Sequence, residues 1–478
     1  MQKGREWGSY RAGVGAAVAC VLLCAAAVAG ITPRPRAADA LPAKPNILMI
    51  LTDDQRFDEL DRMPILNSEL VGRGVTFRNG LISDPLCCPS RATILSGTYS
   101  HTNGVYTNVN TTGGFRHFHD ATTIATVLQT AGYRTGLVGK YLNGYVDPGY
   151  VPPGWDRWFA LTSLHYFNFS VSDQGQSVQY GSTDYQTDVL GQQAVGFVRT
   201  APLNQPIFLY WAPYAPHGPA KPAAKYRGVL SGIPPLRPPS YNEADVSDKP
   251  GYIQALPLWT QKQMKTEDRF RQHQYECLLS VDDWVGAILQ ALTDTGRMQN
   301  TLVVFMGDNG HPIGEHRLGG PGNAKEKESP YEESLKVPFI VRWDGAAWAV
   351  PRIDGDHIVA NVDLAQTFAE AAGTAMRGGE GLSLLPLLAD PSTVWRSDIL
   401  IEHGVDQRYI PSYCGVRGTE WIYVQYATGE EELYDLASDP FQLQNVAGDP
   451  NDLNELTQMR QRDHELCNPV PPGFVWHE

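Results

Sequence analysis

Four apolar runs, each leading into polar or charged side chains, constrain the fold of this chain more than any other feature. They cover residues 46–51, 135–139, 206–211 and 301–306. A nearly unbroken apolar run of this length is typical of a strand that is buried on both faces in a parallel sheet. We therefore predict an α/β fold whose functional site is built at the carboxyl ends of these strands, where ligands bind in open sheets.

The residues at the ends of the four runs are the first candidates for chemistry. In chain order they are Asp53 with Asp54, Lys140, His217, and Asp308 with Asn309. Carboxylate and amide oxygens are hard ligands that suit calcium or magnesium. A helix cap would explain one aspartate equally well, but two in a row after a buried strand favour a metal. Lys140 would ordinarily be solvated surface, and its expected place at the same sheet edge makes it a candidate.

The segment from Cys87 to Gly97 predicts a short helix that directly follows two adjacent cysteines. Pro89 fits the first helical position and Gly97 the position just past the end. Cys87 and Cys88 would then lie at the helix N-terminus, whose free N–H groups favour an anion, and Arg91 would lie one turn further on. Adjacent cysteines in an exported protein are also common as disulfide partners or buried packing, so the segment alone leaves both interpretations open.

Residues 1–40 have the pattern of an export signal. Arg5 and Arg11 make a basic start, residues 12–31 are apolar or glycine, and an A-x-A cleavage pattern ends at Ala40. We therefore expect a mature chain that is secreted, periplasmic or on the cell surface. An uncleaved signal that acts as a membrane anchor is the alternative, because the apolar run approaches spanning length.

The sequence pattern changes towards the C-terminus. Runs that alternate and contain aromatic residues, such as 421–426, predict antiparallel strands. We predict a larger domain over 41–389 and a smaller one over 390–478, as the chain length favours. Cys414 and Cys467 both lie in the smaller part, where an oxidising compartment would allow a bridge between them.

The string C-x-P-S-R at Cys87–Arg91, followed by A-T-I-L-S-G, resembles the signature of type I sulfatases. Other elements follow in the family's order, namely T-D-D-Q at 52–55, G-K-Y at 139–141, A-P-H at 215–217, G-D-N-G at 307–310 and E-L-Y-D-L at 432–436. The doubled cysteine and the sequences at 139–143, 279–283 and 395–398 are similar to N-acetylglucosamine-6-sulfatases. The resemblance implies an alkaline-phosphatase-like fold, with a large mixed sheet flanked by helices and a smaller C-terminal α+β domain built on an antiparallel sheet.

The resemblance also implies roles for these residues. In the family the first cysteine of the string is oxidised to formylglycine, so Cys87 is the expected position and a formylglycine-generating enzyme the expected maturation partner. The metal, usually calcium with magnesium as the alternative, would be held by Asp53, Asp54, Cys87, Asp308 and Asn309. The sulfate and the reacting groups would be contacted by Arg91, Lys140, His217 and Lys327. Lys327 is preferred to Lys325 for its spacing to Lys336, and His165 and His311 are further candidates for substrate binding.

The implied chemistry follows from these parts. One hydroxyl of a hydrated aldehyde at Cys87, acidified by the metal and Arg91, would attack sulfur and give a covalent sulfo-enzyme. The surrounding cations would offset charge that develops on the sulfuryl oxygens. His217 or a lysine would protonate the departing alcohol. The second hydroxyl would then collapse to the aldehyde and expel sulfate, a step that an unmodified thiol cannot perform.

The substrate and the competing functions stay open at this point. A sulfated sugar such as N-acetylglucosamine 6-sulfate suits the resemblance. The net charge of −14 argues against nucleic acid and anionic membranes as partners, but not against a small sulfated sugar, which needs only a local cationic pocket. A phosphonate monoester or phosphodiester hydrolase and a catalytically inactive sugar-binding relative are the alternatives. Leu142 stands where many arylsulfatases have a histidine, which argues against their leaving-group chemistry.

Overall fold

The computed structural model describes residues 44–109, 111–320, 327–404 and 410–477. The expected export signal at 1–40 lies outside these residues. Within the described ranges, no helix is both long enough and apolar enough to cross a membrane.

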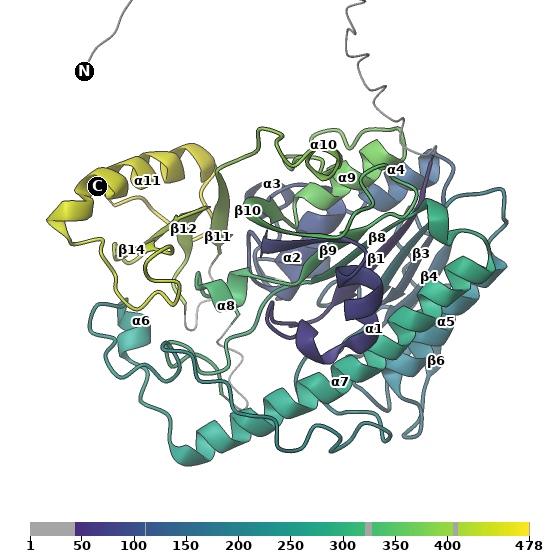
Figure 1. Cartoon of the computed structure of the whole chain (residues 1–478), viewed down its shortest axis with the longest axis horizontal. Helices are drawn as coiled ribbons and strands as arrows, with labels where there is room; N and C mark the ends of the chain where they lie inside the picture. The colour runs from purple at the N-terminus through teal and green to yellow at the C-terminus, as the bar shows by residue number, and fades with distance from the viewer. Residues whose placement is uncertain (1–43, 110, 321–326, 405–409, 478) are drawn as a thin grey trace, which may run out of the picture. The chain divides into compact units, whose positions relative to one another are not determined.

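A ten-stranded mixed sheet forms the larger part of the structure (Figure 1). Its strands, in spatial order, are β10 (Arg352–Ala360), β2 (Val75–Leu81), β9 (Phe339–Arg342), β8 (Thr301–Gly307), β1 (Asn46–Thr52), β7 (Ile207–Ala212), β3 (Arg134–Gly139), β4 (Arg157–Leu161), β5 (Ser170–Asp173) and β6 (Gln176–Gln179). The four predicted runs are the adjacent strands β8, β1, β7 and β3, which are parallel to their neighbours within this group. Antiparallel pairs at β9, β5 and β6 make the sheet mixed, which confirms the predicted fold class.

Helices cover both faces of this sheet. The helices of the described residues are α1 (Pro64–Leu66), α2 (Cys87–Ser96), α3 (Ser100–Asn103), α4 (Ile124–Thr130), α5 (Gln186–Thr200), α6 (Gly251–Gln254), α7 (Gln261–Asp294), α8 (Glu332–Leu335), α9 (Asp363–Ala371), α10 (Leu385–Ala389) and α11 (Leu453–Leu466), with short 3-10 or π turns at Leu60–Arg62, Asn67–Val71, Phe115–His117, Met298–Asn300 and Pro450–Asp452. Of these, α11 packs on the smaller C-terminal sheet. In Figure 1, α4, α9 and α10 lie on one side of the sheet and α5 and α7 on the other.

Burial on both faces explains why the central strands are apolar without alternation. Along β1, Met49 and Leu51 share a core with residues of α2, α4 and α9. Leu48 and Ile50, which point the other way, share a second core with residues of α5 and α7. Because successive side chains of a strand point to opposite faces, a strand between two cores needs apolar residues at every position.

The aromatic stretch around Trp158 and Tyr166 belongs to these cores rather than to the surface. Trp158, Tyr166 and Phe169 are buried, and Trp158 donates a hydrogen bond from Nε1 to the hydroxyl of Tyr145 at 2.8 Å. These rings therefore pack the interior at the β4 side of the sheet.

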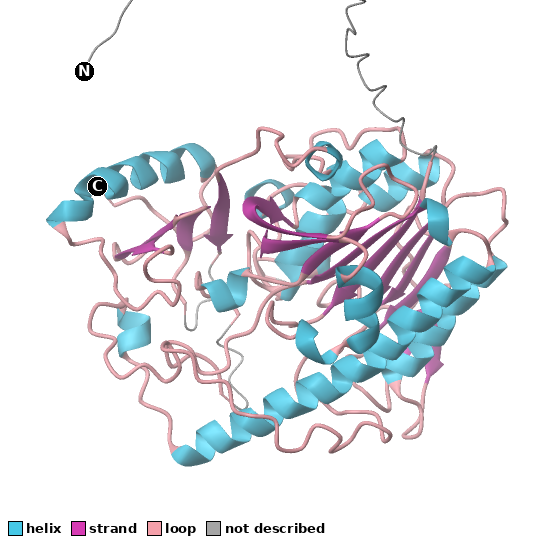
Figure 2. Ribbon diagram, viewed as in Figure 1, coloured by secondary structure: helices cyan, strands magenta, loops and turns pink. Residues whose placement is uncertain are grey.

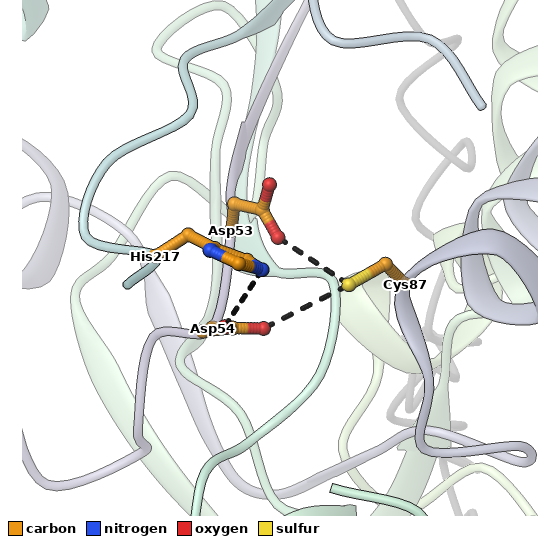
Figure 3. A group of neighbouring side chains, drawn as sticks. All are labelled: Asp53, Asp54, Cys87 and His217. Atoms are coloured by element: carbon orange, nitrogen blue, oxygen red, sulfur yellow. Dashed lines mark hydrogen bonds and ion pairs between the residues drawn. The ribbon is translucent and has the colours of Figure 1, made fainter. Parts of the chain in front are cut away.

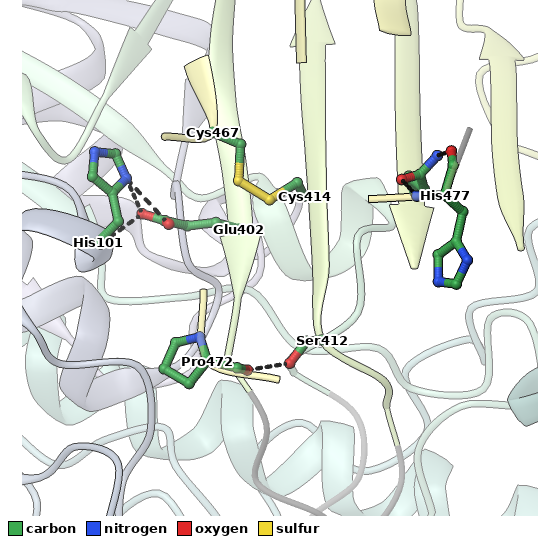
Figure 4. Close-up of a disulfide and its surroundings, with 8 residues drawn as sticks. His101, Glu402, Ser412, Cys414, Cys467, Pro472 and His477 are labelled. Carbon is green, nitrogen blue, oxygen red and sulfur yellow. Dashed lines mark hydrogen bonds and ion pairs between the residues drawn. A yellow bond between two sulfur atoms is a disulfide. The ribbon is translucent and has the colours of Figure 1, made fainter. Parts of the chain in front are cut away.

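A second, four-stranded antiparallel sheet lies in the C-terminal region, and Figure 2 shows its strands as a separate group. Its strands are β11 (Asp398–His403), β12 (Tyr413–Gly418), β13 (Trp421–Tyr426) and β14 (Glu431–Asp435). The Cys414–Cys467 disulfide, which the sequence allowed, joins β12 to the residue that follows α11 (Figure 4). The predicted antiparallel sheet is confirmed, whereas the domain boundary at residue 390 stays a prediction.

Candidate active site

The site lies where the central strands of the large sheet end. Asp53 follows β1, Lys140 follows β3, and Asp308 follows β8. The loop after β7 turns back over the same edge, because Asp53 donates a backbone hydrogen bond to the carbonyl of Ala215 at 3.2 Å. That contact brings His217 beside the end of β1.

Asp53 lies at the centre of the cluster and contacts both a cation and the candidate nucleophile. Its Oδ2 accepts a hydrogen bond from Lys140 Nζ at 2.6 Å, and the Sγ of Cys87 lies 3.5 Å from its Oδ1. All three side chains are buried. Burial would raise the pKa of Asp53, but the charge of Lys140, the largest opposing effect, helps to hold that pKa below its usual range.

Asp54 turns its side chain into the same cluster with a left-handed backbone. Its φ of 63° is uncommon for a residue with a side chain, and its backbone N–H is held by Asp308 Oδ1 at 3.1 Å. Its Oδ1 accepts from Asn309 Nδ2 at 2.9 Å. Its Oδ2 pairs with Lys327 and lies 3.4 Å from His217 Nε2. Against the effect of burial, His217 and Lys327 hold the pKa of Asp54 below its usual range.

Cys87 is the first residue of α2, which corrects the prediction that Pro89 begins this helix. Proline is tolerated throughout the first turn, because the N–H groups there have no partner within the helix. Gly97 ends the helix in the left-handed conformation at φ 69°, as predicted. Figure 3 shows the Cys87 sulfur pointing at Asp53 and Asp54. Cys88 instead belongs to the apolar core, so only the first cysteine faces the cluster.

Arg91 links three parts of the site from one turn further along α2. Its Nε donates to Asp308 Oδ2 at 2.7 Å, and its Nη1 donates to the carbonyl of Lys140 at 2.8 Å. Its Nη2 lies 3.9 Å from Asp53. Burial and the nearby Asp53 raise the pKa of Asp308 to about 6, although Arg91 opposes the shift.

Lys327 reaches the same cluster from a segment far from Cys87 in sequence. Its Nζ pairs with Asp54 and lies 3.7 Å from the sulfur of Cys87. Lys325, the less favoured alternative, lies outside the described residues. The three carboxylates at positions 53, 54 and 308 thus meet three cations, which are Arg91, Lys140 and Lys327.

The two further histidine candidates differ in their surroundings. His311 is buried, and burial lowers its pKa to about 3 although the nearby Asp54 opposes this shift. His165 is exposed, and its carbonyl accepts a hydrogen bond from Gln186 at 2.9 Å. Among the described residues, the imidazole of His165 has no hydrogen bond or ion pair with the cluster. Its part in substrate binding stays a prediction.

Two asparagines support the first turn of α2, and sequence reasoning missed both. Asn108 Oδ1 accepts from the backbone N–H of Cys88 at 2.9 Å. Asn361 Nδ2 donates to Ser90 Oγ at 3.3 Å. Each is an isolated polar residue far from Cys87 in sequence, and no local pattern marks it.

The donor set fits a divalent cation that prefers oxygen. Ligand atoms of Asp53, Asp54, Cys87 and His217 lie within 4.8 Å of one another. The Oδ1 of Asn309 is buried and has no hydrogen-bond partner among the described residues. An unpaired buried amide oxygen beside paired carboxylates is a group that a calcium or magnesium ion would satisfy.

Comparison with known proteins identifies the family. The sulfatase family profile matches residues 45–374, and the profile described as N-sulphoglucosamine sulphohydrolase, C-terminal, matches residues 323–468. A putative extracellular sulfatase Sulf-1 homolog from Caenorhabditis elegans is 34% identical over 381 residues, which are 75% of this chain and 52% of that protein. The chain thus spans about half the length of that relative.

Two further relatives cover most of both chains. Human N-acetylglucosamine-6-sulfatase is 31% identical over 468 residues, which are 86% of this chain and 83% of the human protein. The solved structure of a protein in complex with its substrate D-glucosamine-2-N,6-O-disulfate has the same fold, with a TM-score of 0.77 and 22% identity over 88% of this chain and 97% of that one. The present chain therefore belongs to the sulfatase family.

Proposed function

We propose that this protein hydrolyses sulfate esters of sulfated sugars, such as N-acetylglucosamine 6-sulfate, at the site around Cys87. One observation supports this most directly. Cys87 lies at the N-terminus of α2 with its sulfur 3.5 Å from Asp53 and 3.7 Å from Lys327 Nζ. Carboxylates that can bind a cation thus surround the position of the nucleophile, together with a lysine and helix N–H groups that can bind an anion.

Conversion of Cys87 to formylglycine by a formylglycine-generating enzyme is part of the proposal. Burial raises the pKa of the Cys87 thiol well above its usual range, so the unmodified side chain is a poor nucleophile at neutral pH. A hydrated aldehyde would instead supply one hydroxyl to attack sulfur and a second to expel sulfate afterwards.

Asp53, Asp54, Asp308 and Asn309 would hold the cation, with calcium favoured over magnesium by the family resemblance. When bound, the ion would acidify the attacking hydroxyl and offset charge on the sulfate. Two lysines of the chain would act on the same charge of the sulfate. Lys327 and Lys140 flank Cys87, and they would stabilise the sulfuryl oxygens as negative charge develops on them.

His217 is placed to handle the proton of the departing alcohol. Its Nδ1 lies 2.7 Å from the carbonyl oxygen of Gly218, which can only accept, so Nδ1 has a proton and Nε2 is the free acceptor. Nε2 faces Asp54 Oδ2 at 3.4 Å. Burial lowers the pKa of His217, so a proton that Nε2 takes up as the attacking hydroxyl loses it would be released readily to the departing alkoxide.

The sugar specificity and the export of the protein are the less direct parts of the proposal. A sulfated glucosamine substrate is suggested by the names of the human relative and of the solved complex. Export is suggested by the pattern at 1–40 and by the extracellular relative from C. elegans.

Relative rates on matched esters test the function. Protein produced together with a formylglycine-generating enzyme and supplied with calcium would be assayed on nitrophenyl sulfate, the matching nitrophenyl phosphonate, and N-acetylglucosamine 6-sulfate. We expect sulfate hydrolysis well above phosphonate hydrolysis, and a preference for the sugar. Faster phosphonate cleavage would assign the protein to the phosphorus-ester alternative, and metal binding without turnover of any ester would favour the inactive sugar-binding alternative.

A further inference from the structure

The segment that bears Lys327 is held between the two sheets. It runs from Lys327 through α8, which lies between the large and the small sheet in Figure 1. On one side it is bonded to the large sheet and its site loop. The carbonyl of Leu335 accepts from Ile82 N at 2.9 Å, and that of Ser334 accepts from Gly310 N at 2.9 Å.

On the other side, buried side chains of the small sheet and of the loop after β14 hold the same segment. Arg417 of β12 donates from Nε and Nη2 to the two carboxylate oxygens of Glu332, both at 2.9 Å. The backbone N–H of Glu332 donates to Gln442 Oε1 at 2.8 Å. A two-point guanidinium–carboxylate contact fixes the direction as well as the distance of the groups it joins.

A second buried contact reinforces the first. Tyr331 donates from its hydroxyl to Glu432 Oε1 of β14 at 2.8 Å. Glu432 also accepts from the hydroxyls of Tyr426 and Tyr434, so its carboxylate is fixed by the small sheet itself. These groups are buried, and a buried polar cluster whose members are all bonded has little freedom to shift.

His403 of β11 adds a third contact, beside the loop that leads into α2 at Cys87. Its Nε2 lies 3.6 Å from Glu328, the residue after Lys327. Its Nδ1 lies 3.7 Å from Asp84, three residues before Cys87. The small sheet thus reaches both the segment of Lys327 and the loop that leads into α2.

We propose that Arg417 is a positioning residue for sulfate hydrolysis, which acts by holding Lys327 in place through Glu332. This inference rests on the proposed function. Lys327 must lie close to both Cys87 and Asp54, and its backbone is fixed by the residues that follow it. A displacement of about 1 Å of a group that contacts the reacting atoms lowers a rate by about 10²-fold. Buried ion pairs add little to the free energy of unfolding, so stability alone does not explain the Arg417–Glu332 pair. Holding Lys327 in place would explain it.

A double-mutant cycle between Arg417→Met and Lys327→Met tests the proposal. On the natural background, Arg417→Met should lower kcat/KM for N-acetylglucosamine 6-sulfate by about 10- to 100-fold. On the Lys327→Met background it should change kcat/KM by less than about twofold, because the group it positions is absent. A merely structural effect of Arg417 would lower kcat/KM equally on both backgrounds, and that result would overturn the proposal.

Two further variants separate positioning from folding. Arg462 of α11 makes a similar two-point contact with Asp398, at 2.9 Å for both nitrogens, but its side chain is 40% exposed. Arg462→Met should leave kcat/KM unchanged. Tyr331→Phe removes one hydroxyl from the buried cluster and should show a smaller loss with the same dependence on Lys327. If Arg417→Met fails to fold, the same cycle with Arg417→Lys decides, because lysine keeps the charge but not the two-point contact with Glu332, and equal losses on both backgrounds would again overturn the proposal.

Binding of inorganic sulfate separates this inference from the proposed function. In calcium-loaded Cys87→Ala protein, calorimetry should show weaker sulfate binding after Lys327→Met or Arg417→Met, and no further weakening when the two are combined. If the wild type does not turn over but the binding cycle shows this coupling, the proposed function fails and the role of Arg417 stands. Equal weakening on both backgrounds overturns the role of Arg417 whether or not the wild type is active. If the wild type neither turns over nor binds sulfate, both are overturned.

Discussion

Replacement of Arg91 by lysine tests the electrostatic construction of the site. The guanidinium donates at once to Asp308 Oδ2 at 2.7 Å and to the carbonyl of Lys140 at 2.8 Å. A single ammonium on a shorter head group can keep the ion pair but not both hydrogen bonds. One buried acceptor would be left without a partner, which costs about 1–3 kcal/mol in the free energy of unfolding.

The effect on catalysis should be larger than the effect on stability. In Arg91→Lys the positive charge moves away from the reacting atoms, and a misplacement of about 1 Å lowers kcat/KM by about 10²-fold. Thermal unfolding with calcium present and hydrolysis of N-acetylglucosamine 6-sulfate measure the two effects. Arg73→Lys is the matched control, because Arg73 pairs with Glu69 and Asp344 while half exposed. We expect that control to change stability by less than about 0.5 kcal/mol.

The reasoning on Arg91 would be refuted if Arg91→Lys were as stable and as active as Arg73→Lys. Loss of stability without loss of activity would refute the catalytic part alone. It would mean that Arg91 holds Asp308 and the loop of Lys140 but does not act on the sulfate.

Three further perturbations follow from the same structure. Lys327→Met should lower kcat/KM by about 10²- to 10³-fold, as loss of one donor to a developing oxyanion does, and unchanged kinetics would remove Lys327 from the site. A chelator should lower the Tm and abolish turnover. Added calcium should then restore the Tm of the wild type more than the Tm of Asn309→Ala. Equal recovery of the two Tm values would exclude Asn309 as a ligand. Although burial opposes it, Glu380 and Glu402 raise the pKa of His101 from 6.5 to about 10. Figure 4 shows the contact between His101 and Glu402. This contribution to stability is present below pH 6.5 and lost as the pH rises towards 10, so His101→Gln should flatten the fall in Tm over that window.

The central strands and the residues at their ends could be predicted from the sequence. The apolar runs at 46–51 and 301–306 correspond to β1 and β8 within one residue at each end. Burial on both faces leaves no polar alternation to confuse such a pattern, and adjacent parallel strands end at the same edge. For that reason Asp53 and Asp308 could be expected to meet although they are far apart in sequence.

Other features could not be predicted, because they depend on contacts across long stretches of chain. The second half of α7 has an apolar face that its sequence pattern predicts, whereas its polar first half, which begins with a capping box between Thr260 and Gln263, gives no such signal. Asn108 and Arg417 contact the catalytic segments through single side chains, and one polar residue in a loop or strand gives no periodic signal. Long-range hydrogen bonds of this kind become visible only in three dimensions.

Turnover by Cys87→Ser tests the central claim most directly. A serine hydroxyl at this position could accept one sulfuryl group, but it has no second hydroxyl with which to expel sulfate. With calcium present, wild-type protein that contains formylglycine should release sulfate from N-acetylglucosamine 6-sulfate over many turnovers. Cys87→Ser should release at most one equivalent of the sugar alcohol per protein and no free sulfate. Rapid multiple turnover by Cys87→Ser would contradict the account.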